Sequence, residues 1–244
     1  MNQIRLQKFL SMAGVCSRRQ GERHILAGDI RVNGTIITVL GTRVDPEKDR
    51  IEFCGKPVAS SPQPLYIALN KPPGYVTSCK QPQERIVTSL VDIPERIFPV
   101  GRLDKESEGL LLLTNDGHLH QRLSHPSFDH EKVYRVTVAR PIANGDLKRL
   151  AGGIDLDGIR TRPAIVRRLS GKSFLMTLRE GRNRQIRRMA GKIGHRVKRL
   201  KRIRMANIRL GKLKSGQWRY LTEAEKNVLL NDVAVMADRQ NEKA

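Results

Sequence analysis

Asp104 is the acidic residue whose surroundings in the sequence best suit chemistry. It stands shortly before an apolar run, Leu110–Leu113, and has Arg102 and Lys105 close by. Neighbouring positive charge favours the ionised form of a carboxyl group. An ionised carboxylate can act as a covalent nucleophile at a sugar carbon, as in retaining glycosidases. It can equally be a structural ion-pair partner, and composition and spacing leave these two interpretations even.

Other chemistry-bearing residues form no convincing site. The chain has no phosphate-binding loop, no dinucleotide-binding glycine motif and no zinc-binding signature of a protease or deaminase. Its three cysteines are far apart and form no Cys-x-x-Cys pair, which disfavours a zinc site or disulfide framework. His118 and His120 have ligand-like spacing but are interpreted as solvated loop. Glu106, Glu108 and Asp116 cluster in sequence, yet Asp116 lies in an Asn-Asp-Gly turn. We therefore expect no metal ion.

The charge of the chain points to a polyanionic partner. Lys and Arg outnumber Asp and Glu 46 to 24, a net charge of +22, which favours nucleic acid. An anionic membrane surface is the second possibility, but there is no long apolar span, lipidation motif or signal peptide. Between Arg179 and Arg219 there are 16 basic residues and one acid, so the polyanion should meet this half most strongly. Aromatic residues make up only 4% of the chain, which disfavours extended base-stacking platforms.

Residues 1–58 are predicted to form a small helix-helix-hairpin module. An amphipathic helix is expected from Ile4 to Ala13. A second helix is expected from Ser17, which has capping-box spacing with Gln20. Asn33-Gly34 is a strong two-residue hairpin signal.

Residues 59–64 are rich in Pro and Ser and are predicted to be a linker to a second domain, residues 65–240. This domain is expected to be α+β, with more strands than helices. A capping box at Thr222 and Glu225 predicts a last helix that runs to about Met236. The other expected elements are strands at 65–70, 110–114, 132–138, 164–169 and 174–178, a helix at 183–193, and a strand-rich stretch at 195–210.

The stretch RLQKFLSMAGVCSRRQGERHILAGDIRVNG resembles the S4 RNA-binding domain, through its R-L-x-K-x-L start, its S-R-R and its V-N-G hairpin. The resemblance implies binding of structured RNA through the two-helix face and the hairpin. Arg18 and Arg19 lie in the first turn of the second predicted helix, where positive charge is unfavourable against the helix dipole. A bound phosphate at this position would compensate for that repulsion. Each basic residue taken alone fits a solvated face equally well. The candidate RNA contacts of this module are Arg5, Lys8, Arg18, Arg19, Arg31 and Asn33.

The segment around Asp104, GRLDKESEGLLLLTNDG (residues 101–117), resembles the catalytic signature of pseudouridine synthases of the RsuA/RluB/RluF family. Three further segments agree in order: ALNKPPGYV, HEKVYRV and EGRNRQIRRM. With the N-terminal module, the resemblance covers nearly the whole chain, to about Thr222. It implies an α+β chain in which the S4 domain precedes a larger, mostly antiparallel-sheet catalytic domain.

The resemblance also implies roles for individual residues. Asp104 would be the nucleophile that detaches uracil from its ribose and lets it bond again through carbon. Tyr134 would stack on the flipped uracil and assist proton removal from the ring carbon. Arg187 would pair with Asp104 and keep it ionised and aimed, with Arg188 as the nearest rival. Arg102 would enter the RNA stack in place of the extruded nucleotide.

Further residues receive supporting roles. Ser107 and Gly109 are interpreted as turn formers that let the loop pass close to substrate, and Leu110–Leu113 as a strand buried on both faces. Isomerisation of uridine has no redox step and no second substrate, so no cofactor is expected. The remaining candidate RNA contacts are Lys71, Arg184 and Arg188.

The leading hypothesis is therefore an rRNA pseudouridine synthase. Its motifs look closer to the large-subunit (23S) members of RluB/RluF type than to the small-subunit (16S) RsuA type, which stays an alternative. A catalytically silent RNA-binding or ribosome-assembly protein is a second alternative. A DNA-binding regulator would fit the charge but lacks a recognition-helix dimer pattern. We expect a cytoplasmic monomer that binds ribosomal RNA or a pre-ribosomal particle, and neither membrane nor DNA.

Overall fold

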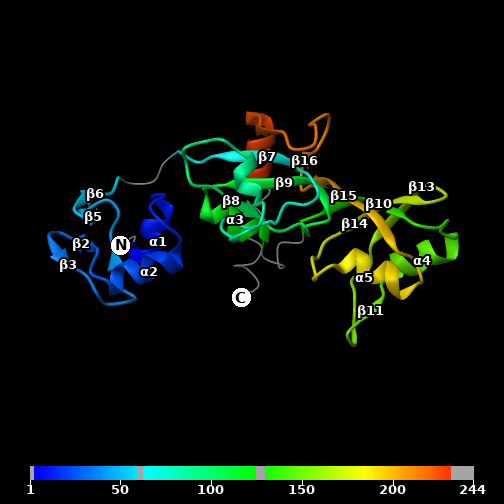
Figure 1. The fold of residues 1–244 in the computed structure, drawn as a ribbon, viewed down its shortest axis with the longest axis horizontal. Coiled ribbons are helices and arrows are strands. Elements are labelled where there is room, and N and C mark those ends of the chain that lie inside the picture. Colours follow the sequence, from blue (N-terminus) through cyan, green and yellow to red (C-terminus); the bar gives the residue numbers. More distant parts are fainter. Residues whose placement is uncertain (1–2, 60–62, 125–129, 232–244) are drawn as a thin grey trace. The chain divides into compact units, whose positions relative to one another are not determined.

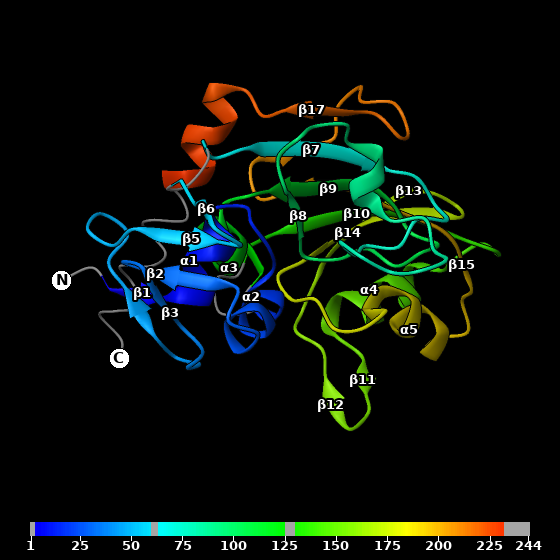
Figure 2. The same ribbon diagram turned by 60° about the vertical axis from the view of Figure 1, so that its left-hand side comes forward.

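The computed structural model describes residues 3–59, 63–124 and 130–231. The chain divides into two compact units (Figure 1, Figure 2). The first holds residues 1–65 with two short later segments, 93–97 and 115–117, and the second holds the remainder. No helix within the described ranges has the length and apolar composition needed to span a bilayer.

The first unit combines two helices with short strands. Its core contains Leu6, Phe9, Leu10, Ile25 and Ile30, all buried. A four-stranded sheet has the order β3-β2-β5-β6, and β1 pairs with β4. The elements are β1 (Ile4–Arg5), α1 (Leu6–Met12), α2 (Arg18–Leu26), β2 (Ile30–Val32), β3 (Thr35–Ile36), β4 (Arg43–Val44), β5 (Ile51–Phe53) and β6 (Lys56–Pro57).

Two local predictions for this unit are confirmed and one is wrong. Ser17 and Gln20 form the capping box at the start of α2. Asn33 and Gly34 both have positive φ, 51° and 83°, as a hairpin turn of this kind requires. The first helix, however, begins at Leu6, because Ile4 and Arg5 pair with β4. Arg5 therefore lies on a strand and not on the first helix.

The second unit is built on a nine-stranded sheet with main order β13-β14-β10-β15-β9-β7-β17. The β9–β15 pair is parallel, and the other strand pairs described in this sheet are antiparallel. The strands are β7 (Tyr66–Lys71), β8 (Phe98–Val100), β9 (Glu108–Thr114), β10 (Lys132–Val138), β13 (Ile165–Ser170), β14 (Ser173–Leu178), β15 (Val197–Met205), β16 (Ile208–Arg209) and β17 (Trp218–Tyr220). The hairpin β11–β12 (Asp155–Leu156, Ile159–Arg160), the 3-10 turn η1 (Val87–Leu90) and the helices α3 (Gly117–Ser124), α4 (Asn144–Gly152) and α5 (Gln185–Lys192) complete it.

The predicted α+β class with a mostly antiparallel sheet is confirmed. The strand predicted at 132–138 coincides with β10, and the helix predicted at 183–193 is the shorter α5. Thr222 and Glu225 form their capping box, with both hydrogen bonds present. The helix that follows is described to residue 231, so its predicted end near Met236 lies outside the described residues.

The interpretation of His118 and His120 as loop residues is wrong, because both lie on α3. That helix buries Leu119 and Leu123, four residues apart on one face. The helix α4 was not predicted either, although it buries Leu147 and Leu150 at helical spacing.

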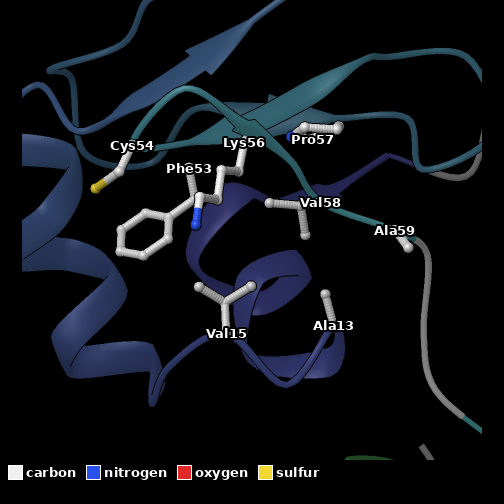
Figure 3. Close-up of a pocket in the computed structure, with 8 residues that line it drawn as sticks. All are labelled: Ala13, Val15, Phe53, Cys54, Lys56, Pro57, Val58 and Ala59. Carbon is white, nitrogen blue, oxygen red and sulfur yellow. The ribbon is translucent and has the colours of Figure 1, made fainter.

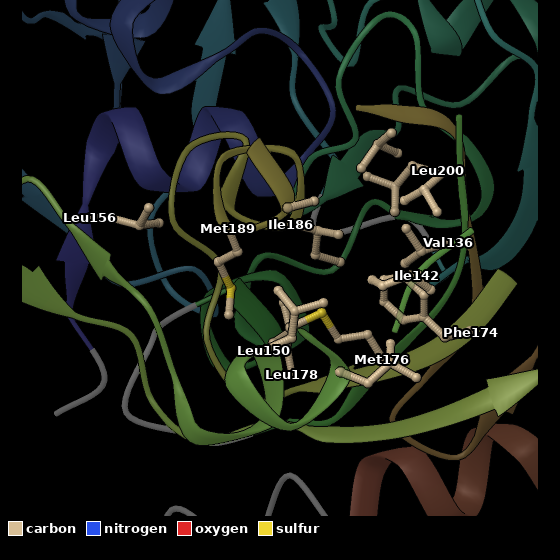
Figure 4. Packing of buried hydrophobic residues seen from close by; sticks show 14 residues of the cluster. Val136, Ile142, Leu150, Leu156, Phe174, Met176, Leu178, Ile186, Met189 and Leu200 are labelled. Carbon is tan, nitrogen blue, oxygen red and sulfur yellow. The ribbon is translucent and has the colours of Figure 1, made fainter. Parts of the chain in front are cut away.

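Helices α4 and α5 pack on one face of β10, β14 and β15 (Figure 2). Ile186 and Met189 from α5 and Leu150 from α4 meet Met176 and Leu178 of β14 in a continuous apolar cluster (Figure 4). This cluster fixes α5 against the sheet, and with it the arginine motif that α5 carries.

Candidate active site

A buried lysine, Lys71, binds the backbone of the loop that carries Asp104. Lys71, at the end of β7, has no exposed surface. Its Nζ donates to the carbonyl oxygens of Asp104 at 3.1 Å, Lys105 at 3.3 Å and Ser107 at 2.7 Å, and to that of Pro72 at 3.1 Å. The prediction that Lys71 contacts RNA is therefore wrong, because its ammonium group is enclosed beneath the loop.

Burial is the largest influence on the pKa of this ammonium group. Burial lowers the pKa of Lys71 to about 8, although the carboxylates of Asp104, Glu106 and Glu108 oppose that shift. Lys105, which was expected to flank Asp104 with positive charge, instead binds Glu84 at 2.7 Å. The cations close to Asp104 thus come from elsewhere in the fold.

Arg187 on α5 is one of these cations. Its Nε lies 3.9 Å from Asp104 Oδ2. Its Nη2 donates to Ser107 Oγ at 3.2 Å, and Ser107 Oγ in turn lies 3.5 Å from Asp104 Oδ2. Arg188, its neighbour on the helix, turns away and pairs with Asp157 at 2.5 Å. Of the two candidates, Arg187 is therefore the arginine that the fold places beside Asp104.

Ser107 and Gly109 have different structural roles next to Asp104. The amide of Ser107 donates to the carbonyl of Asp104 at 3.0 Å, which closes a turn as predicted. Gly109 has φ +105°, and a Cβ there would lie 2.2 Å from the carbonyl oxygen of Arg202 on β15. Its predicted role in substrate approach is thus replaced by a packing one, because β9 and β15 come too close for any side chain.

Tyr134 and Asp104 share a pocket. Tyr134 projects from β10 toward the α4–α5 side of the sheet, and it lines this pocket together with Arg102, Asp104 and Ser107. The pocket also has apolar walls: Leu103, Leu178, Ile186 and Leu200. The Asp104 side chain keeps 28% of its exposure, so a substrate can reach it.

Arg102, Asp104 and Tyr134 line this pocket, and Arg187 contacts Asp104 and Ser107, so three separate segments of the chain come together at the Asp104 carboxylate. Arg102 lines the pocket and is exposed. An ionised carboxylate beside a guanidinium and a tyrosine, in a partly apolar pocket, suits nucleophilic chemistry on a neutral base.

Arg184 binds within the protein. It pairs with Glu106 at 2.9 Å, and its hydrogen bond lowers the pKa of Glu106. Glu108 is bound by Arg199. Each of these two acids is thus used by an arginine, and no group of three or more metal-ligating side chains occurs among residues 3–59, 63–124 and 130–231.

The predicted contacts of the first unit lie mostly on its surface. Arg5, Arg18, Arg19 and Arg31 are exposed and Lys8 is half-buried. Asn33 has both polar ends engaged, since Nδ2 donates to Asp49 at 2.9 Å and Oδ1 accepts from the amide of Arg50 at 2.9 Å. The Asn33 side chain therefore anchors the hairpin turn.

A shallow pocket in this unit is apolar in character. Val15, Phe53 and Val58 form its walls, and Lys56 crosses its edge (Figure 3). Cys54 is exposed there. Its lining contains no aspartate, glutamate or histidine.

Residues 65–192 match the family model for RNA pseudouridylate synthase, and residues 4–51 match the S4 domain. The chain belongs to the RNA pseudouridylate synthase family. It is a pseudouridine synthase with an N-terminal S4 RNA-binding domain, and the resemblance found in its motifs is confirmed.

Similar proteins agree along most of the chain. An uncharacterized RNA pseudouridine synthase of Aquifex aeolicus is 46% identical, over 92% of this chain and 93% of that protein. Ribosomal large subunit pseudouridine synthase B of Bacillus subtilis is 41% identical, over 91% and 93%. The dual-specificity RNA pseudouridine synthase RluF of Escherichia coli K12 is 38% identical, over 91% and 77%. A crystal structure of a pseudouridylate synthase superposes with a TM-score of 0.69 at 31% identity, covering 93% of this chain and 99% of that one.

The burial of two residues in this synthase's site was not predicted from the sequence. Lys71 follows Ile67 and Leu69 at two-residue spacing, which places it on a buried face of its strand. Arg202 follows Leu200 in the same way on β15 and is 1% exposed. The alternation carried a signal for burial, but long cations are seldom buried, so Lys71 was predicted to contact RNA and Arg202 was not singled out.

Proposed function

We propose that this synthase converts a uridine of ribosomal RNA, in the large subunit, into pseudouridine with Asp104 as its nucleophile. The observation that carries the proposal is that Asp104 and Tyr134 line one pocket while Arg187 approaches the Asp104 carboxylate, the three residues coming from three separate motifs. The large-subunit target is supported by the name of the Bacillus subtilis relative.

The reaction rearranges bonds within one nucleotide. The C1′–N1 bond breaks, the uracil turns and a C1′–C5 bond forms, while C5 loses a proton and N1 gains one. Asp104 attacks the nucleoside, and the bond that it forms breaks again before the product leaves, which restores the carboxylate. Arg187 pairs with this carboxylate and aims it. Tyr134 stacks on the uracil and assists removal of the C5 proton. Arg102 enters the RNA stack and so offsets part of the cost of extruding the base.

The proposed domains and basic residues bind the RNA and bring the uridine to the pocket. Residues 1–58 form the S4 domain, residues 59–64 the linker and residues 65–240 the catalytic domain. The exposed arginines Arg18, Arg19 and Arg31, together with Arg5 and Lys8, contact RNA phosphates, as do Arg184 and Arg188 once RNA competes for them. The protein acts as a cytoplasmic monomer on ribosomal RNA or a pre-ribosomal particle, without binding membrane or DNA.

The test is a map of pseudouridines in ribosomal RNA from cells with and without the gene. We expect one modified uridine of the large-subunit RNA to be lost, and to return when the purified protein acts on RNA from the deleted strain. Loss of a small-subunit position would move the target to the other subunit. An unchanged map, with no conversion by the purified protein, would contradict the proposal.

A further inference from the structure

A second cavity lies beside the Asp104 pocket, on the other side of Tyr134. The two share Arg102, Tyr134, Glu180 and Gly181 in their linings. The second cavity, which we call the Arg202 cavity, has a volume of about 270 Å³. That is several times the roughly 30 Å³ that one water molecule occupies, so it has room for part of a ligand.

The two cavities differ in charge. The Asp104 pocket has two carboxylates, Asp104 and Glu180, and one cation, Arg102. The Arg202 cavity has Glu180 alone as an acid and four cations: Arg102, Lys132, Arg179 and Arg202. A neutral base suits the first lining. The second lining suits an anion, and in an RNA strand the anion next to a base is a phosphodiester.

Arg202 is the unusual member of this set. Its side chain is 1% exposed and lies next to Tyr134 across the β10–β15 pairing. Its Nε donates to the carbonyl of Leu110 at 2.7 Å and its Nη1 to that of Arg102 at 3.5 Å. Its Nη2 has no hydrogen-bond partner among the residues that the structure describes. A buried guanidinium with an unused donor is costly unless something else accepts the bond.

We propose that the Arg202 cavity is a phosphate subsite, in which Arg202 Nη2 donates to an RNA phosphodiester oxygen next to the target uridine. The inference rests on the proposed function and extends it to a second binding position. Lys132 and Arg179 lie around the bound phosphate, and Arg179 is already held in place by Glu131 at 3.0 Å.

The subsite also sets the register of the substrate. Arg202 binds carbonyl groups on both sides of Asp104, at Arg102 and Leu110. A phosphate on Nη2 is thereby tied to the segment that carries the nucleophile. The nucleotide that extends from this phosphate is held at a fixed distance from Asp104, with Tyr134 between the two cavities.

The test uses an RNA fragment that the native protein converts. The phosphodiesters on the 5′ and 3′ sides of the target uridine are replaced, one at a time, by uncharged methylphosphonate. For each RNA, kcat/KM is measured with the native protein and with the Arg202→Met, Lys132→Gln and Lys198→Gln variants. Lys198 is the control, since it is exposed on β15 and lines neither cavity.

With the native protein, one of the two replacements should lower kcat/KM about tenfold, as loss of a charge-assisted hydrogen bond does. With Arg202→Met the same replacement should cost less than about twofold, because the hydrogen bond is already absent. Lys132→Gln should also make the replacement lower kcat/KM by less than tenfold. This variant leaves the hydrogen bonds from Arg202 to Leu110 and Arg102 intact, so it provides the test if Arg202→Met does not fold. Lys198→Gln should keep the full tenfold cost.

Two results would overturn the subsite. One is that neither replacement affects the native protein. The other is that the replacement lowers kcat/KM by the same factor in the native protein, in Lys132→Gln and in any folded Arg202 variant. Arg202 Nη2 would then donate only to a buried water and not to the RNA. Failure of the proposed function looks different, because the native protein would then not convert the unmodified fragment at all.

Discussion

Asp104 is held by two kinds of contact that act on different atoms. Lys71 binds its carbonyl oxygen and those of its neighbours from below. Arg187 and Ser107 face its carboxylate. The loop is thus fixed by its backbone, while the carboxylate remains partly exposed and directed into the pocket. Two substitutions separate these contacts.

Arg187 and Arg188 provide a matched pair for the first. Arg187→Met should lower kcat about 100-fold, because the cation beside the nucleophile is removed. Arg188→Met removes an equal charge from the next position, which faces Asp157; it should weaken RNA binding but leave kcat at saturating RNA within about twofold. Single-turnover conversion of a bound RNA fragment measures both. Equal losses of kcat in the two variants would show that the reaction depends on the total positive charge of α5 and not on the position of Arg187 beside Asp104.

Lys71 gives the second test, through pH. Because its pKa is lowered to about 8, it loses a proton, and one of its donors to four carbonyl groups, as the pH rises through that value. The kcat of the native protein should therefore fall above pH 8. Lys71→Met should lower kcat about tenfold at pH 7, as expected from losing hydrogen bonds of a charged group, and should remove this alkaline decline.

The fall in kcat is distinct from unfolding. Between about pH 8 and 10.5 the unfolded chain binds more protons at Lys71 than the folded chain does, so this group's contribution to the free energy of unfolding rises with pH. A pH profile of kcat, measured beside urea unfolding at the same pH values, separates the two effects. An alkaline decline of the same size in Lys71→Met would assign it to another group.

At the residue scale, the family resemblance of the motifs led to Asp104, Tyr134 and Arg187, whose roles stay predictions and which the fold brings close together. The sequence was not enough to predict the burial of Lys71 and Arg202. Their burial depends on the approach of β7 and β15 to the loop before β9, and such long-range contacts leave only a faint alternation in the sequence.

Among the elements, β9 is the one on which the site depends. All seven of its residues are buried, and it pairs with β7, β8 and β15. The run Leu110–Leu113 predicted this burial. The parallel β9–β15 contact was not predicted, and it is what requires glycine at position 109.

Gly109→Ala tests that requirement. Its Cβ would meet the backbone of Arg202, and its φ is strained for any L side chain, so the free energy of unfolding should fall by about 3 kcal/mol. Gly117→Ala is the control, because its Cβ meets nothing within 4 Å; it should change stability by less than about 1 kcal/mol. Urea unfolding measures both. A small effect at Gly109 would mean that β9 and β15 can separate at little cost.

Element boundaries were harder to predict than the motifs themselves. The capping boxes at Ser17 and Thr222 and the Asn33-Gly34 turn were recognisable because they are local. Ile4 and Arg5 continue a helical pattern in sequence but pair with β4 about 40 residues away. Tertiary pairing overrode the local preference there, as it often does at the ends of short helices.

At the scale of the whole molecule, charge is concentrated toward the catalytic half. The first 60 residues carry 10 basic and 6 acidic residues, against 16 basic and one acid between 179 and 219. The S4 domain therefore adds a smaller electrostatic contribution to a strongly basic synthase domain. Both should appear in the salt dependence of RNA binding.

Deleting residues 1–58 should weaken binding of an rRNA fragment and flatten its salt dependence. For each phosphate that the protein no longer neutralises, the slope of log K against log salt falls by about 0.7 to 0.9. The double variant Arg18→Gln, Arg19→Gln in the full chain should show part of the same change. Filter binding at several salt concentrations measures the slopes. An unchanged slope in the deleted protein would remove the S4 domain from the RNA interface.

The most direct test of the central claim is conversion of uridine by Asp104→Asn. The substitution keeps the size of the side chain and leaves the backbone bonds to Lys71 in place, but it removes the nucleophilic carboxylate. With a purified rRNA fragment that the native protein converts, we predict no pseudouridine above background and an RNA affinity within about threefold of native. Pseudouridine formation by this variant at a rate near that of the native protein would contradict the assignment of Asp104 as the nucleophile.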